Sequence, residues 1–161
     1  MNHFLRLMAA FTLIIALLLL AAPTAPANAQ SRVTYTITEK DINAYRLPAA
    51  VRRLVSNVSV DLQRDQAVVK AKVAYGRLTL DTVSTWQPVI SNGRLTWKAT
   101  SATVGGTPLT AAQLATLNST AKRAIEDAVK RYIDSKVRGR YIIESVSVTD
   151  DELIVTVSFN R

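Results

Sequence analysis

The residue types that most often perform catalysis are sparse in this chain of 161 residues. It has no cysteine, and its one histidine, His3, lies close to the N-terminus. Once a cleaved leader has removed His3, a Ser-His-Asp triad, a cysteine nucleophile and a zinc site of the usual ligands are excluded. A serine-lysine or carboxylate-pair hydrolase stays open, but neither an S-x-x-K motif nor a glycine-rich phosphate loop supports it. We therefore expect a protein that is not an enzyme and holds no cofactor.

The densest acidic group consists of Asp150, Asp151 and Glu152. It has the residue types of a divalent-cation site, but it also separates two alternating apolar segments, where Asp is favoured for its turn geometry. The turn interpretation is the better one, and it predicts no metal site. Glu144 stands alone on an otherwise apolar face of the preceding segment. A local twist or an edge position explains it more simply than catalysis does.

The first residues have the pattern of a secretory signal peptide. Arg6 is the only charge, the run from Leu7 to Ala22 is apolar except for Thr12, and the small residues Ala27 to Ala29 form a cleavage pattern. An uncleaved membrane anchor is the alternative, but the run is shorter than the roughly 20 residues that span a bilayer. We expect cleavage after Ala29. Residues 30–161 then form a single domain that is exported to the periplasm or the extracellular cell envelope.

The charge of the chain indicates what kind of partner it meets. The formal net charge is +8, and the exported domain keeps about +7, which favours anionic partners such as lipid headgroups or cell-wall polymers. We expect no nucleic-acid binding, because the basic residues are scattered and are not interleaved with exposed aromatic residues. A purely solubilising role for the charge stays open.

Alternating apolar residues predict a largely antiparallel sheet. A short helical segment near the N-terminus is marked by Thr38 as its cap and Asp41 three residues later, and Pro48 ends it. The sequence Asn92-Gly93 is typical of a tight hairpin turn. Alternation slips near Val83, which suggests a bulge, and Pro88 argues against a long central strand. The predicted strands cover residues 31–37, 58–63, 67–75, 78–90, 94–104, 141–149 and 152–159.

A long amphipathic helix is predicted between the last two groups of strands. Thr110 and Gln113 have capping-box spacing, and apolar residues recur every three or four positions from Leu114 to Ile133. About 27 residues give a helix of roughly 40 Å. The fold class that follows is α+β: a curved antiparallel sheet of about five or six strands wrapped on one long helix, with a short N-terminal helical segment.

The two tryptophans receive different interpretations. Trp97 alternates in phase with Leu95 and Ala99, which indicates a core position. Trp86 precedes Gln87-Pro88 at a predicted loop edge, where its ring would be partly exposed. It is there either an ordinary surface aromatic residue or a contact with a membrane interface.

Several strings together resemble a known family. They are Ile37-Thr-Glu-Lys-Asp-Ile-Asn-Ala-Tyr45, Asn92-Gly-Arg-Leu-Thr-Trp97, the Gly105-Gly106 step before the long helix, and Glu144-Ser-Val-Ser-Val-Thr-Asp-Asp-Glu-Leu153. The chain resembles the LmeA-like and YpmS-like exported bacterial proteins, which are related to the tubular lipid-binding (TULIP) superfamily. The resemblance implies a curved sheet along a long helix, with an apolar groove between them for lipid acyl chains.

The leading hypothesis is therefore an envelope protein that binds a lipid or another hydrophobic small molecule and makes peripheral contact with an anionic membrane surface. The alternative that the same residues form a core without a ligand stays open. So does a structural or interaction module that binds a protein or an anionic polymer through its basic face. The predicted groove is lined by Val60, Val69, Val73, Leu95, Trp97, Leu114, Leu117, Ile125, Val129 and Tyr132.

Overall fold

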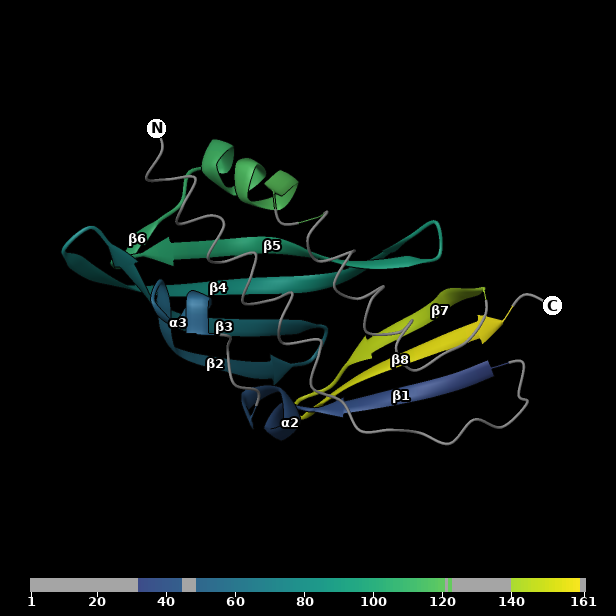
Figure 1. The fold of residues 1–161 in the computed structure, drawn as a ribbon. Helices are drawn as coiled ribbons and strands as arrows, with labels where there is room; N and C mark the ends of the chain where they lie inside the picture. The colour runs from purple at the N-terminus through teal and green to yellow at the C-terminus, as the bar shows by residue number, and fades with distance from the viewer. Residues whose placement is uncertain (1–31, 45–48, 121, 123–139, 160–161) are drawn as a thin grey trace.

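The computed structural model describes residues 32–44, 49–120, 122 and 140–159 (Figure 1). The predicted signal peptide, residues 1–29, lies outside this part of the chain. Residues 111–120 are also helical. The elements in chain order are β1 (Arg32–Thr38), α2 (Glu39–Ala44), α3 (Ala49–Arg52), β2 (Val55–Gln63), β3 (Gln66–Tyr75), β4 (Leu78–Ser91), β5 (Arg94–Val104), β6 (Thr107–Pro108), β7 (Tyr141–Val148) and β8 (Glu152–Phe159).

The middle of the chain forms a five-stranded antiparallel sheet with the order β2-β3-β4-β5-β6. Each strand pairs with the next along the chain through a short turn, as alternating apolar segments separated by turn residues predict. The turn at Asn92 and Gly93 has φ angles of 53° and 69°, which confirms the predicted hairpin.

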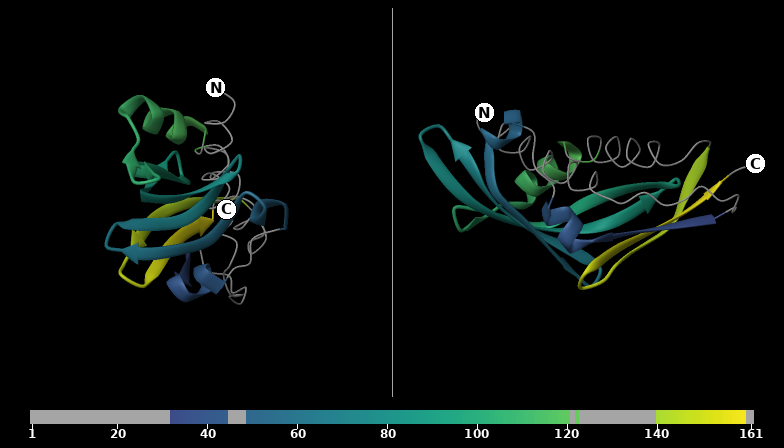
Figure 2. Two further views of the ribbon diagram at one scale, coloured as in Figure 1. Left: turned by 90° about the vertical axis from the view of Figure 1, so that its left-hand side faces the viewer. Right: turned by 60° about the horizontal axis from the view of Figure 1, so that its bottom comes forward.

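The two ends of the described chain form a second antiparallel sheet with the order β1-β8-β7. Tyr35 lies opposite Val155, and Val155 lies opposite Val146. The sheets are joined where the Asp65 N–H donates to the Val148 carbonyl at 3.0 Å. In the right-hand view of Figure 2 they extend from this junction like the arms of a V.

The prediction of one sheet wrapped on one long helix is wrong. Strands make up most of the described residues, they belong to two sheets rather than one, and α2 and α3 are short. The physical reason is that β1 pairs with β8 and not with the neighbouring hairpin of β2 and β3. Of the segment predicted as a long helix, residue 121 and residues 123–139 lie outside the described chain.

The short N-terminal helix is confirmed at α2. The Asp41 N–H donates to Thr38 Oγ1 at 3.1 Å, and the Thr38 hydroxyl donates to the Asp41 carboxylate at 2.6 Å. The capping box before residue 111 is also present, because the Thr110 N–H donates to Gln113 Oε1 at 2.9 Å. Both caps satisfy backbone donors that a helix start leaves unpaired.

Two expectations about β4 are wrong. The strand runs through Pro88 without interruption, and its bulge lies between Thr85 and Trp86 rather than near Val83. Proline is tolerated because β3 pairs with β4 only from Leu78 to Trp86, so no neighbour on that side needs the missing N–H of Pro88.

Candidate functional site

The sheet residues of the predicted groove lie on one face of the five-stranded sheet, which we call the inner face. Val60 pairs with Val69 across β2 and β3, and alternation places Val73, Leu95 and Trp97 on the same side. All five are almost fully buried. The other buried apolar residues of the inner face are Val55, Leu62, Ala67, Ala71, Trp86, Ala99 and Ala102.

The helical residues 111–120 add further apolar side chains to the same hydrophobic cluster. Leu117 is fully buried, and Leu114 is partly buried and packs against the cluster. The remaining predicted lining residues, Ile125, Val129 and Tyr132, lie outside the described residues. The structure thus joins the two described helical residues with the sheet residues of the predicted site.

The inner face contains polar groups that have partners. The Thr82 hydroxyl donates to the Ala71 carbonyl at 2.9 Å, and Trp86 Nε1 donates to Ser84 Oγ at 2.7 Å. All of these side chains are buried. Because each donor reaches an acceptor on the sheet itself, these groups cost little in the apolar interior.

Trp97 differs from Trp86 in this respect. Its side chain is on the inner face and the residue is 5% exposed, yet Nε1 has no hydrogen-bond partner among the residues that the structure describes. Thr96 Oγ1 shares this property, but strand alternation directs Thr96 to the opposite face. Leaving a buried donor unpaired costs about 1–3 kcal/mol. Among the described residues, Trp97 Nε1 is thus a buried N–H group of the inner face without an acceptor.

The expectation that Trp86 is partly exposed is wrong. The residue is 0% exposed, because it lies inside β4 between Ala67 on β3 and Ala99 on β5 instead of at a loop edge. Trp86 is a core residue, and it contributes no contact with a membrane interface.

Two asparagines that the sequence analysis missed cover the edges of the five-stranded sheet. Asn43 of α2 accepts from the Val60 N–H at 2.8 Å and donates to the Val60 carbonyl at 2.7 Å. Asn118 makes the same pair of bonds with Ala99 on β5, at 2.7 and 2.9 Å. Each amide takes the place of a neighbouring strand and satisfies edge groups that would otherwise be unpaired. No sequence pattern marks them, because the bonded residues are 17 and 19 positions apart.

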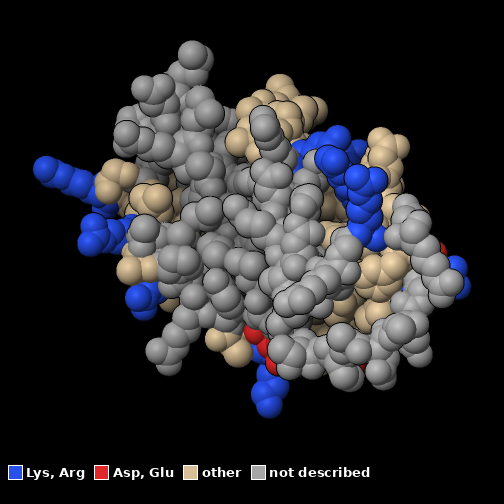
Figure 3. All heavy atoms as spheres, turned by 45° about the vertical axis from the view of Figure 1, so that its right-hand side comes forward, with Lys and Arg blue, Asp and Glu red and all other residues tan. Residues whose placement is uncertain are grey.

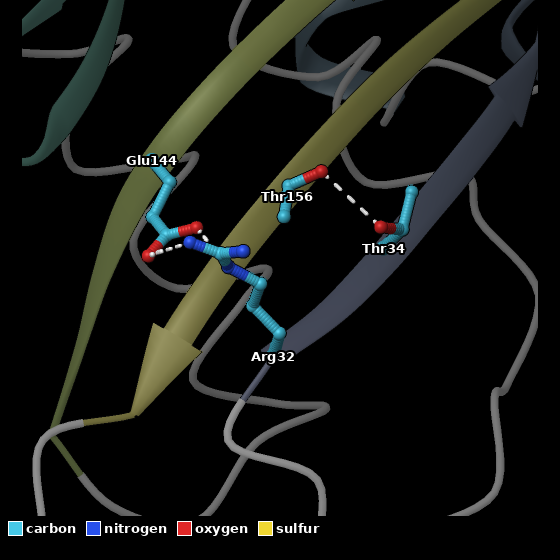
Figure 4. A network of polar contacts seen from close by, with 4 residues as sticks. All are labelled: Arg32, Thr34, Glu144 and Thr156. Carbon is cyan, nitrogen blue, oxygen red and sulfur yellow. Dashed lines mark hydrogen bonds and ion pairs between the residues drawn. The ribbon is translucent and has the colours of Figure 1, made fainter.

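A polar network lies on the other sheet (Figure 4). Arg32 of β1 reaches over β8 to Glu144, with Nε donating to Oε2 at 2.5 Å and Nη2 donating to Oε1 at 3.2 Å. Glu144 is the additional residue of a bulge in the edge strand β7, which confirms the expected edge position. The hydrogen bonds from Arg32 lower the pKa of Glu144. Partial burial opposes this shift, and a hydrogen bond from Ser158 supports it.

The Arg32–Glu144 pair makes stability depend on pH. Because the pKa of Glu144 is lower in the folded chain than in the unfolded one, its contribution is present above the ordinary pKa of glutamate. It is lost as the pH falls through the lowered value. We expect Glu144→Gln to lower the melting temperature slightly at neutral pH and to flatten its decline in acid. Equal acid dependence of the two proteins in thermal melts would contradict this.

The acidic group at the β7–β8 junction forms a turn. Asp150 and Asp151 lie between the strands, and the Glu152 N–H donates to Thr149 Oγ1 at 3.1 Å. Within the described residues, no three His, Cys, Asp or Glu side chains are arranged to hold a metal ion. No described helix has the length and apolar character needed to cross a bilayer.

The described residues form a mostly β protein with two joined antiparallel sheets, short helices and a buried apolar face on which Trp97 Nε1 has no acceptor among these residues. No family model matches the chain, and no curated protein matches it.

Proposed function

We propose that this protein is an exported binding protein, not an enzyme, and that it takes a lipid or a similar hydrophobic molecule against the inner face of the five-stranded sheet. The inner face supports this by its composition, because valine, leucine, alanine and tryptophan form nearly all of its buried surface. Ligand sites for such molecules are mostly apolar and have few, well-placed polar groups. The resemblance to tubular lipid-binding proteins supports the same class of ligand.

The single observation that carries the proposal is the unpaired Trp97 Nε1. Burial alone does not separate a ligand site from a core that the chain fills by itself. A buried N–H without an acceptor supports a ligand site, because most buried polar groups in a folded chain have a partner. A bound molecule with a carbonyl or carboxylate oxygen beside its hydrocarbon chain would accept from this indole. We therefore propose an acyl lipid or fatty acid rather than a pure hydrocarbon.

The predicted export supports the same assignment. The apolar run from Leu7 to Ala22, followed by small residues, is typical of a secretory signal. A lipid-binding domain in the cell envelope would meet acyl lipids at the membranes around it.

The test is native mass spectrometry of the chain purified without detergent from the compartment that receives it, together with lipid extraction of the same sample. We expect a stoichiometric adduct with the mass of an acyl lipid and an intact protein mass that lacks residues 1–29. A bare protein mass that stays bare after added anionic phospholipid would contradict ligand binding. A mass that retains residues 1–29 would contradict cleavage alone.

A further inference from the structure

One end of the five-stranded sheet combines exposed leucines with arginines that have no ion pair among the described residues, and we call it the basic end. It consists of the segment after α3, with Arg53 and Leu54, and the turn between β3 and β4, with Arg77 and Leu78. The Ala74 N–H donates to the Leu54 carbonyl at 2.8 Å, and Tyr75 pairs with Leu78. These bonds hold the two segments on either side of β3.

The leucines at the basic end are held out in solvent. Leu54 is 50% exposed and Leu78 is 63% exposed. Gly76 has a φ of 62°, so the two residues Gly76 and Arg77 reverse the chain in a tight turn. Leu78 begins β4 beside this turn, ahead of the region that the core covers. Both leucines thus project from an end of the sheet and not from its packed middle.

The charges of the basic end are strongly one-sided. Arg52, Arg53 and Arg77 are exposed, and the one carboxylate among residues 49–56, 72–81 and 103–109, all of which are described, is Asp81. Asp81 Oδ1 lies 3.3 Å from Lys72 Nζ, so this carboxylate already forms an ion pair with a lysine. In Figure 3, Lys and Arg side chains project at the left-hand edge, where none of the coloured residues is Asp or Glu, and another group of Lys and Arg lies at the upper right.

The opposite end of the same strands is acidic. The ten residues of β3 separate the two ends by roughly 30 Å. At the far end the Asp65 N–H bonds to the Val148 carbonyl, and the Glu39 N–H bonds to the Asp151 carbonyl. These contacts gather the carboxylates of Glu39, Asp41, Asp61, Asp65, Asp150, Asp151 and Glu152, which outnumber the basic residues Lys40, Arg64 and Arg94 at the same end.

We propose that the basic end docks on the surface of an anionic lipid bilayer. Two exposed leucines flanked by three arginines fit a bilayer, because the leucines can enter the interface while the arginines meet phosphate groups. An anionic polymer would use the arginines but would leave the leucines in water. The acidic end is repelled by the same surface, so the long direction of the sheet points away from the membrane. This proposal stands apart from ligand binding on the inner face.

Vesicle sedimentation tests the proposal with the protein as it is purified. We expect binding to vesicles of phosphatidylcholine mixed with phosphatidylglycerol, weak binding to phosphatidylcholine alone, and weaker binding at high salt. Each arginine changed to glutamine should weaken binding about fivefold. The double variant Leu54→Ser, Leu78→Ser should weaken binding about tenfold or more, because less apolar surface enters the interface.

Matched controls come from other exposed positions of the same sheet. One control is Arg64→Gln, because Arg64 lies in the β2–β3 turn at the acidic end. The other is Val89→Ser, because Val89 is an exposed apolar residue on β4. Both should bind as the unchanged protein does. Because all these side chains are exposed, thermal melts should show that every variant remains folded. Unchanged binding by the leucine double variant, or an equal loss in the controls, would overturn the proposal.

Discussion

Replacing Trp97 with phenylalanine should lower the affinity for an acyl-ester ligand about tenfold, which corresponds to about 1.4 kcal/mol. Phenylalanine keeps an aromatic ring in the inner face but removes the N–H that we propose donates to the ligand. The stability of the ligand-free protein should stay within about 1 kcal/mol of the original. The reason is that lost ring volume destabilises the fold, while loss of an unpaired donor stabilises it. Fluorescence titration and chemical denaturation measure the two quantities.

Trp86→Phe is the matched control for this substitution. Trp86 lies on the same face, but its Nε1 is already paired with Ser84 Oγ. Its replacement should destabilise the fold by about 1–3 kcal/mol and leave the preference for an acyl ester over a hydrocarbon of equal length unchanged. If Trp97→Phe weakens binding of ester and hydrocarbon equally, the indole does not act as a donor to the ligand.

Replacing Asn118 with alanine should lower the free energy of unfolding by about 2 kcal/mol. The substitution removes both bonds to the backbone of Ala99 and leaves this edge of β5 without partners. Asn43→Ala should have an effect of similar size at Val60 on the other edge. Uncovered edges also pair with other chains, so both variants should associate more at high concentration. Denaturant titration and light scattering check the two effects.

Ser119→Ala is the control for the edge prediction. Ser119 is next to Asn118, but its hydroxyl donates only to the Thr116 carbonyl of its own helical turn, at an exposed position. The change should fall within about 0.5 kcal/mol. An Asn118→Ala protein as stable as Ser119→Ala would show that the amide does not hold the edge of β5.

Local signals predicted much of the secondary structure. The Thr38 cap, the turn at Asn92 and the strands on either side depend on residues close together in the chain, so their patterns are visible in the sequence. The same holds for the inner face, because a period of two places Val69 and Val73 on one side of β3 whatever the partner strand is.

The arrangement of the strands was not predictable in this way. In the pairing of β1 with β8, Arg32 lies opposite Ser158. No local sequence pattern predicts a pairing between strands that are so far apart in the chain. Two half-buried antiparallel sheets have the same alternation as one larger sheet. Pro88 was misinterpreted for a related reason: its cost depends on whether a neighbouring strand needs its N–H.

The apolar side chains of the candidate site were predictable from the sequence, but their hydrogen-bond partners were not. Alternation identified the apolar side chains, but it does not reveal that Trp86 finds an acceptor in Ser84 while Trp97 finds none among the described residues. The basic end could not be predicted from local patterns either. Leu54 and Leu78 lie in separate segments, and only the pairing around β3 brings them to one end of the sheet.

The most direct test of ligand binding uses the indole N–H signals in ¹H–¹⁵N spectra, because the chain has only two tryptophans, Trp86 and Trp97. The ligand-free protein is titrated with an acyl ester and, separately, with a hydrocarbon of equal chain length. We predict that the ester shifts the Trp97 indole proton downfield and slows its exchange with solvent, while the Trp86 signal stays in place. Unchanged Trp97 signals with saturating ester would contradict the account.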